Sequence, residues 1–315
     1  MKILIGYDGS KSAEAALDDL QSAGLPDEAE ALVLSVAEVW IPPQSFNGNG
    51  TDIKLNAESE THLSNHFEKN KRAIGEVETF ARHAADRLRV KFPGWKINSE
   101  AIYGSPGWEI LNKADAFEPD LIVVGSHGRS AVGRFFLGSI SNKVLTEAKC
   151  SVRVARGKVE VDPLPMRVVI GFDGSPGAKA AVETVAARHW REQSEIRLVA
   201  ASSQIAPMTI ERFVPPIARW VAAEVKAESE WIERLAENSL RILHDAGIVA
   251  TLHITAGNPK QILIEEAEKW HADMIFVGAN SSASRLERFL IGSTSAAVAA
   301  RAHCSVEVVR VKTTQ

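Results

Sequence analysis

The residues best suited to chemistry are glycines and serines that follow a short apolar run near the middle of the chain. Residues 121–124 are rich in β-branched side chains, as is typical of a buried parallel strand. A loop with two glycines comes next, and then a segment with helical spacing. These glycines and serines are Gly125, Gly128, Gly138, Ser139 and Ser141. Glycines let the backbone approach an anion, and a helix N-terminus offers free N–H groups. The pattern predicts a phosphate-binding loop. A glycine-rich turn with a serine cap is the plainer alternative, and both stay open on these residues alone.

Composition limits the class of protein. The 315 residues are 45% hydrophobic and 24% charged, which is typical of a globular protein of two ordinary domains. A net charge of −4 argues against bulk binding to nucleic acid or an anionic membrane, and no apolar run approaches transmembrane length. The chain enters a strand at Met1 without a signal-peptide pattern, and it has only Cys150 and Cys304. We therefore expect a cytoplasmic protein with reduced, buried thiols and with neither nucleic acid nor membrane as a partner.

The chain is one unit copied twice. Ile-Gly-Tyr-Asp-Gly-Ser at 5–10 returns at 170–175, with Phe172 in place of Tyr7, at an offset of 165 residues. Gly138-Ser139 and Cys150 return at offsets of 154 residues, so the first copy is about a dozen residues longer in its middle. Such a repeat decides the architecture. We name residues 1–157 unit 1 and residues 166–312 unit 2, with a short proline-containing linker between them.

Strand and helix patterns alternate within each unit. In unit 1 strands are expected at 2–7, 31–38, 96–102, 120–124 and 151–155, with helices between them, including a long one at 59–90. Unit 2 repeats this order, with a long helix at 217–246 and a last strand at 304–310. The alternation predicts an α/β fold of two tandem doubly wound, mainly parallel five-stranded sheets flanked by helices. Ligands bind such sheets beyond the carboxyl ends of the strands, at the switch in strand order.

These motifs resemble the universal stress protein family, in a tandem form that covers nearly the whole chain. Three features carry the resemblance: Ile-Gly-Tyr-Asp-Gly-Ser at 5–10 with its copy at 170–175, Gly-x-x-Gly followed after nine residues by Gly-Ser at 125–139, and a cysteine before the last apolar strand. The resemblance implies an ATP-binding protein of stress response or signalling, with an adenine nucleotide α-hydrolase-like fold. It also implies that Mg or Mn accompanies the phosphates, held mostly by phosphate and water.

The resemblance assigns site residues by matching position. It implies that Gly6, Asp8, Val36, Val124 and Gly125 line the adenosine portion, and that Gly128, Gly138, Ser139, Ile140 and Ser141 hold the triphosphate. A carboxylate such as that of Asp8 only accepts hydrogen bonds, so it suits hydroxyl or amine donors rather than phosphate. No catalytic residue is assigned, and whether ATP is hydrolysed stays open.

Unit 2 departs from this pattern. Gly278-Ala279-Asn280-Ser281 replaces Gly-x-x-Gly, so the second glycine is lost, while Asp173, Gly292 and Ser293 are retained. A residue with a β-carbon adopts positive φ less readily than glycine. We therefore expect unit 1 to hold the nucleotide, and unit 2 to bind weakly, differently or not at all.

Several alternatives stay open. One alternative is that Asp8 has no ligand contact and acts merely as a turn or helix-cap acceptor, because Asp-Gly-Ser is a turn sequence. His127 and Arg129 lie in the glycine loop, and Arg129 is either a phosphate contact or a solvated cation. Other functions are a slow ATPase or a nucleotide-dependent enzyme of the same fold, or a module that binds another small molecule or a protein. The resemblance also implies an unidentified protein partner and pairing of strands 151–155 and 304–310 within one chain. A homodimer of such chains is a further hypothesis.

Overall fold

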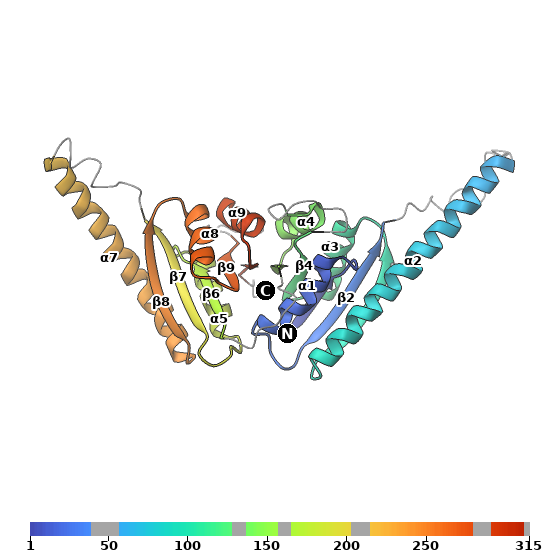
Figure 1. Cartoon of the computed structure of the whole chain (residues 1–315), viewed down its shortest axis with the longest axis horizontal. Helices are drawn as coiled ribbons and strands as arrows, with labels where there is room; N and C mark the ends of the chain where they lie inside the picture. The colour runs from blue at the N-terminus through green and yellow to red at the C-terminus, as the bar shows by residue number, and fades with distance from the viewer. Residues whose placement is uncertain (39–56, 128–136, 157–164, 203–214, 280–290, 312–315) are drawn as a thin grey trace.

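A computed structural model describes residues 1–38, 57–127, 137–156, 165–202, 215–279 and 291–311. Figure 1 shows two similar α/β units side by side, with the long helices on the outer flanks and both chain termini near the middle. The two-domain α/β fold with a mainly parallel sheet is thus confirmed.

Within the described ranges, ten short strands form one sheet. They are β1 (Lys2–Gly6), β2 (Glu30–Ala37), β3 (Lys96–Tyr103), β4 (Leu121–Gly125), β5 (Ser151–Ala155), β6 (Arg167–Gly171), β7 (Glu195–Ser202), β8 (Val249–Ala256), β9 (Met274–Gly278) and β10 (Ser305–Val309). The central strands of both units are valine, isoleucine and leucine runs that are buried on both faces. Continuous apolar runs are what a parallel sheet covered by helices on both sides requires.

Helices connect the strands. They are α1 (Lys11–Asp19), α2 (Ala57–Lys91), α3 (Pro106–Phe117), α4 (Ser139–Glu147), α5 (Pro176–Ala186), α7 (Pro215–Asp245), α8 (Pro259–Lys269) and α9 (Ser293–Arg301), with a short 3₁₀ turn η1 (Leu20–Ser22). Side chains cap several of them: the Ser10 hydroxyl accepts from the Ala13 N–H at 3.1 Å, and Asn258 accepts from the Lys260 N–H at 3.0 Å. Such caps satisfy N–H groups that have no partner inside the helix.

The strand order is β3-β2-β1-β4-β5-β10-β9-β6-β7-β8. Each unit has the same doubly wound order, and the order switches between β1 and β4 in unit 1 and between β6 and β9 in unit 2. The hypothesis that the last strands pair within one chain is confirmed, because β5 and β10 run antiparallel side by side and join the two five-stranded sheets. We call this β5–β10 junction the seam.

The described part of the chain buries three apolar clusters. One lies between α1, α2 and the sheet of unit 1, and a second lies between α5, α7 and the sheet of unit 2. The third continues through both units on the other face of the sheet, where α3, α4, α8 and α9 pack. Val154 and Val306, from the two strands of the seam, both belong to this third cluster. The two units therefore share one core on that face.

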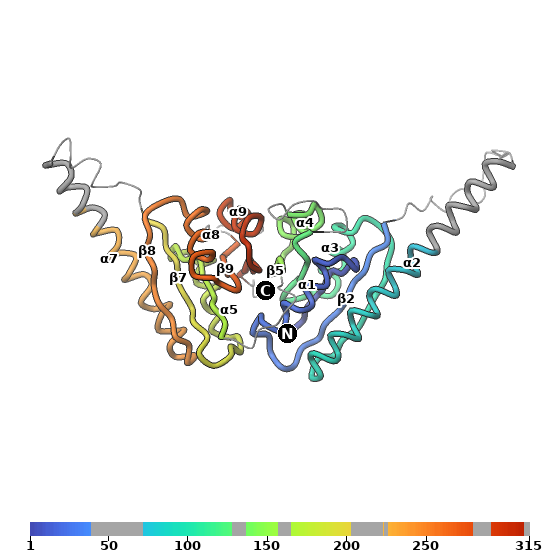
Figure 2. The backbone as a smooth tube through the Cα atoms, viewed as in Figure 1, coloured from blue at the N-terminus to red at the C-terminus, as the bar shows by residue number. Residues whose placement is uncertain are grey.

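Figure 2 follows the same backbone as a tube and shows the coloured parts of α2 and α7 along the two outer sides of the sheet, where they pack on the edge strands. Among the described residues, no helix combines the length and the apolar character needed to cross a membrane.

Candidate functional site

The candidate site of unit 1 lies where β1 and β4 are neighbours and their connections leave in opposite directions. Ile5 pairs with Val123 across these strands. The strands run parallel, so Asp8, just beyond β1, and Gly125, at the end of β4, lie at the same edge of the sheet. Such a switch point is where doubly wound sheets hold ligands.

Asp8 shapes the turn between β1 and α1. Its Oδ1 accepts a hydrogen bond from the Ser10 N–H at 2.9 Å, and Gly9 between them has φ of +74°. Unit 2 repeats the turn, since Asp173 Oδ1 accepts from the Ser175 N–H at 2.9 Å. The carboxylate therefore does act as a turn acceptor. A carboxylate has about four lone-pair sites, so this bond is compatible with a ligand contact as well.

Gly125 sits against the start of α1 so closely that no side chain fits. A β-carbon there would lie 2.9 Å from the backbone carbonyl carbon and oxygen of Ser12. Gly6 is less crowded, because its nearest neighbours would be flexible side-chain tips, Ile110 Cδ1 at 3.0 Å and Val124 Cγ1 at 3.4 Å. Gly125 is thus required by packing within unit 1, whether or not a ligand is bound.

Helix α4 begins at the predicted phosphate side of the site. Gly138 is its N-cap, and its own N–H donates to the Ser126 carbonyl at 2.9 Å. Ser139 is exposed at the first position of the helix, and Ile140 is half-buried against the shared core. The Ser141 hydroxyl is buried and donates to the Gly125 carbonyl at 2.6 Å. Ser141 thus ties α4 to β4 in this structure.

The remaining predicted residues lie as follows. Val124 is buried in the shared core and Val36, on β2, is partly buried against it. Both side chains face the side of the sheet on which α3 and α4 pack. Gly128 and Arg129 lie outside the described residues.

Ser12 and Ser126 form a polar cluster with His127 that sequence reasoning did not assign. The Ser12 hydroxyl accepts from the His127 N–H at 3.1 Å and lies 3.3 Å from the Ser126 hydroxyl. The Ser126 hydroxyl also lies 2.9 Å from His127 Nδ1. Comparison of the two copies could have indicated this cluster, because Gly177 and Ala279 of unit 2 stand at the positions equivalent to Ser12 and Ser126. The residues at the start of the loop thus form a hydrogen-bonded anchor, and Gly177 and Ala279 of unit 2 have no hydroxyls with which to repeat it.

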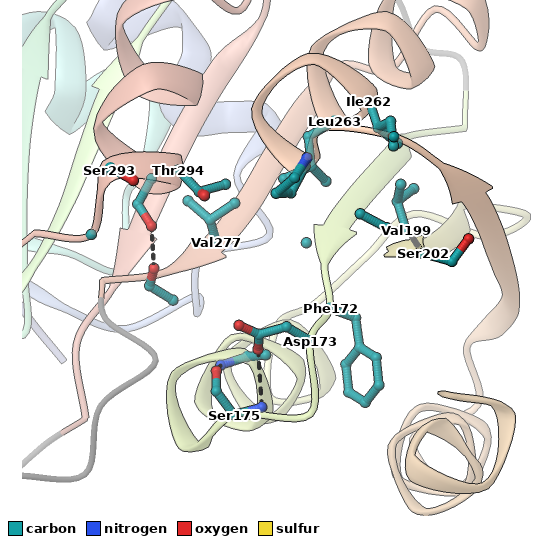
Figure 3. Close-up of a pocket in the computed structure, with 18 of the residues that line it drawn as sticks. Phe172, Asp173, Ser175, Val199, Ser202, Ile262, Leu263, Val277, Ser293 and Thr294 are labelled. Atoms are coloured by element: carbon teal, nitrogen blue, oxygen red, sulfur yellow. Dashed lines mark hydrogen bonds between the residues drawn. The ribbon is translucent and has the colours of Figure 1, made fainter. Parts of the chain in front are cut away.

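Unit 2 has a cavity of about 460 Å³ at the equivalent place, a size within the usual range for small-molecule sites. Figure 3 shows Asp173 and Ser175 on one side of this cavity, Ser293 and Thr294 on another, and Val277 between them. Leu263 closes the apolar side. Unit 2 is the half for which the sequence predicts weaker or different binding, and it still keeps this volume.

Within the described ranges, no three histidine, cysteine, aspartate or glutamate side chains converge as metal ligands. The described residues thus offer no cage for a divalent ion.

The comparisons with known proteins cover both units. The model of the universal stress protein family matches residues 1–156 and 166–310. A universal stress protein of Mycobacterium tuberculosis is 26% identical over 318 residues, which is 98% of this chain and 96% of the relative. One of Mycolicibacterium smegmatis is 27% identical over 313 residues, with the same coverage of 98% and 96%.

Solved structures show the same fold. The crystal structure of a universal stress protein from Archaeoglobus fulgidus has a TM-score of 0.59 and 21% identity, and the match covers 100% of this chain and 97% of that one. A putative universal stress protein from Pseudomonas aeruginosa has a TM-score of 0.58 and 15% identity, with 98% and 92% covered. Because the family model spans almost the whole chain in two copies, the chain belongs to the universal stress protein family.

Proposed function

We propose that unit 1 binds ATP at the carboxyl ends of β1 and β4, and that nucleotide occupancy acts on a protein partner in a cytoplasmic stress response. The observation that carries the proposal is that Asp8, the end of β4 and the exposed start of α4 lie together at the switch in strand order. The start of a helix at such a switch point offers free N–H groups to phosphate oxygens. Asp8 stands at the opposite side, suited to a donor on the ribose or base.

The roles divide between two kinds of contact. Gly128, Gly138, Ser139, Ile140 and Ser141 are proposed to surround the phosphates, and Gly6, Asp8, Val36, Val124 and Gly125 the nucleoside. The Ser141 hydroxyl already donates to Gly125, so its backbone N–H is the group available to a phosphate. A Mg or Mn ion would neutralise phosphate charge while keeping mostly water and phosphate ligands.

Asp8→Asn, with Asp173→Asn as its matched control, tests the proposal. Asparagine keeps the Oδ1 acceptor, so both variants retain the turn before the helix. We expect Asp8→Asn to weaken ATP binding about 5- to 150-fold, the equivalent of about 1–3 kcal/mol for a lost charged partner. Asp173→Asn should leave it unchanged. Titration calorimetry on the whole chain gives affinity and stoichiometry for each variant.

The two variants separate the outcomes. One ATP per chain that is weakened by Asp8→Asn alone supports the proposal. Loss of ATP binding in the Asp173→Asn variant alone would assign the nucleotide to unit 2. Normal ATP affinity in both variants, or no ATP binding by the unmodified chain, would overturn the proposal that unit 1 binds ATP.

The cavity of unit 2 favours a second candidate function, the binding of another small molecule. The lining combines the Asp173 and Glu228 carboxylates with hydroxyls and an apolar wall. A second binding event in calorimetry that Asp173→Asn removes and Asp8→Asn does not would assign it.

A further inference from the structure

The seam has one apolar side and one charged side. In its register Val306 faces Val154, Glu307 faces Arg153, and Val308 faces Val152. The four valines point into the core shared by both units. Side chains alternate along a strand, so Arg153 and Glu307 point to the opposite face. Both are buried, with 0% and 1% of the side chain exposed.

Four charged groups follow one another across that face. Asp19 binds Arg153 through two contacts, Oδ2 to Nε at 2.6 Å and Oδ1 to Nη2 at 3.1 Å. Arg153 Nη1 lies 3.3 Å from Glu307 Oε2, and Glu307 Oε1 lies 2.5 Å from Arg188 Nη2. We call Asp19, Arg153, Glu307 and Arg188 the seam tetrad. Their charges alternate in sign and sum to zero, which is what buried ions require.

The units contribute unlike halves of the seam tetrad. Asp19 and Arg153 belong to unit 1, and Glu307 and Arg188 belong to unit 2. At the repeat offset of 154 residues, Glu307 is the equivalent of Arg153, so one position carries opposite charges in the two copies. At the earlier offset of 165 residues, Thr184 is the equivalent of Asp19, and Ala23 is the equivalent of Arg188. The alternating order of positive and negative charges therefore forms only when a unit 1 meets a unit 2.

Further hydrogen bonds join the halves. The Ser305 hydroxyl of unit 2 donates to Asp19 Oδ1 at 2.6 Å, and Arg188 Nη1 donates to the Ala23 carbonyl of unit 1 at 2.9 Å. Each of the four residues of the seam tetrad thus has one partner in unit 1 and one in unit 2.

Pairing of like units would break this order. Two copies of unit 1 in the same register would place Arg153 opposite Arg153, and two copies of unit 2 would place Glu307 opposite Glu307. Like charges directly across paired strands repel, and a buried pair is little screened by water or salt. The outer pairs, Asp19 with Arg153 and Glu307 with Arg188, would survive in such assemblies, so the repulsion would come from the middle contact.

We propose that the seam tetrad makes the last-strand surface of unit 1 selective for unit 2, so that the chain closes on itself rather than pairing like units between chains. The partner that this surface fits is an edge strand with a carboxylate facing Arg153 and an arginine behind that carboxylate. The selectivity is independent of any nucleotide.

Two full-length charge variants test the proposal when each is studied alone and when they are mixed. Arg153→Glu places two glutamates at the middle of the seam, and Glu307→Arg places two arginines there. We expect each variant alone to lose the closed form. A mixture restores a wild-type seam between unit 1 of the Glu307→Arg chain and unit 2 of the Arg153→Glu chain. Native mass spectrometry should then show a two-chain species that neither variant forms alone.

Two further variants serve as controls. Glu195→Arg makes the same charge change at an exposed position at the start of β7, and it should keep the one-chain mass and wild-type melting temperature. Glu307→Gln removes the charge without adding repulsion, and it should keep the one-chain mass with a melting temperature between those of wild type and Glu307→Arg.

The outcomes divide clearly. A mixed two-chain species supports selectivity. A Glu307→Arg chain with the same mass and melting temperature as Glu307→Gln would overturn it. If single variants are insoluble, the pair is produced together in one cell. A soluble two-chain complex then supports the proposal, and continued insolubility overturns it.

Discussion

At the scale of single residues, the two cysteines show how burial sets reactivity. Cys150 and Cys304 lie at equivalent positions just before β5 and β10, and both are free thiols. Desolvation raises the pKa of Cys150 from 9.0 to about 11, against a smaller opposing effect of the Arg310 charge. Desolvation likewise raises the pKa of Cys304 to about 12, opposed in part by Arg156. Both thiols therefore stay protonated near neutral pH, which agrees with a packing role.

A prediction about alkaline stability follows. An unfolded thiol ionises near pH 9, whereas the folded Cys150 thiol keeps its proton up to about pH 11. The contribution of the thiol to stability is thus fully present below pH 9 and is lost as pH rises through 11, at up to about 1.4 kcal/mol per pH unit. We expect a Cys150→Ala/Cys304→Ala chain to lose less stability than wild type between pH 9 and 11.

Urea unfolding at several pH values measures this difference. The buried Arg310 and Arg156 titrate in the same range and each interacts with one of the thiols, so the comparison measures each thiol together with its effect on the neighbouring arginine. Parallel stability curves for the two proteins would contradict the assignment of raised thiol pKa values.

At the scale of elements, two arginines link each unit to a helix of the other. Arg310, just beyond β10, donates from Nη2 to the Leu145 carbonyl at 2.6 Å and from Nη1 to the Cys150 carbonyl at 3.2 Å, at the end of α4. Arg156, just beyond β5, donates to the Ala299 carbonyl of α9 at 2.6 Å. Burial lowers the pKa of both arginines to about 10, which still leaves them charged at neutral pH. Each guanidinium satisfies carbonyls that have no partner inside their helix.

These contacts predict crossed effects of substitution. Arg310→Gln changes unit 2, yet it should speed hydrogen exchange at the carboxyl end of α4 in unit 1. Arg156→Gln should do the same for α9 in unit 2. Each change should cost about 1–3 kcal/mol, because buried carbonyls lose a charged donor. Hydrogen exchange with mass spectrometry reads both helices in one experiment, so each variant is the control of the other. Faster exchange in the unit that carries the substitution, with no change across the seam, would argue against the contacts.

At the scale of the whole molecule, one sheet and one shared core unite the units. The sheet continues from β3 to β8 without a break, and the core on the α4 and α9 face draws residues from both halves. The seam buries valines on that face and the seam tetrad on the other. Loss of either unit would expose an apolar strand edge and the two seam valines of the remaining unit to water, which is unfavourable.

The shared core predicts a single unfolding transition. Scanning calorimetry of the full chain should give one peak whose van't Hoff and calorimetric enthalpies agree. Two peaks, or a calorimetric enthalpy about twice the van't Hoff value, would mean that the units unfold independently. Arg153→Glu provides the comparison, since a weakened seam should uncouple the units and split the peak.

The sequence alone determined the repeat, the strands and helices, and the family. Val-Val-Gly at 123–125 and the Asp-Gly-Ser turns act through their near neighbours, so their types and spacing predict local structure. The positions of Asp8, Gly125 and Ser139 at one edge also followed, because parallel strands bring their carboxyl ends together.

Only the tertiary structure decided which distant side chains meet. Ser305 and Asp19 are 286 residues apart, and Arg153 and Glu307 are 154 apart, yet each pair is in contact. Sequence periodicity shows that a strand is buried but not the register in which it meets another strand. Side chains alternate along each strand, so this register turns the four seam valines into the shared core and sets Arg153 against Glu307 on the other face. The anchor of Ser12, Ser126 and His127, the Ser141 bond to Gly125 and the cavity of unit 2 likewise depend on chain segments that only the folded molecule brings together.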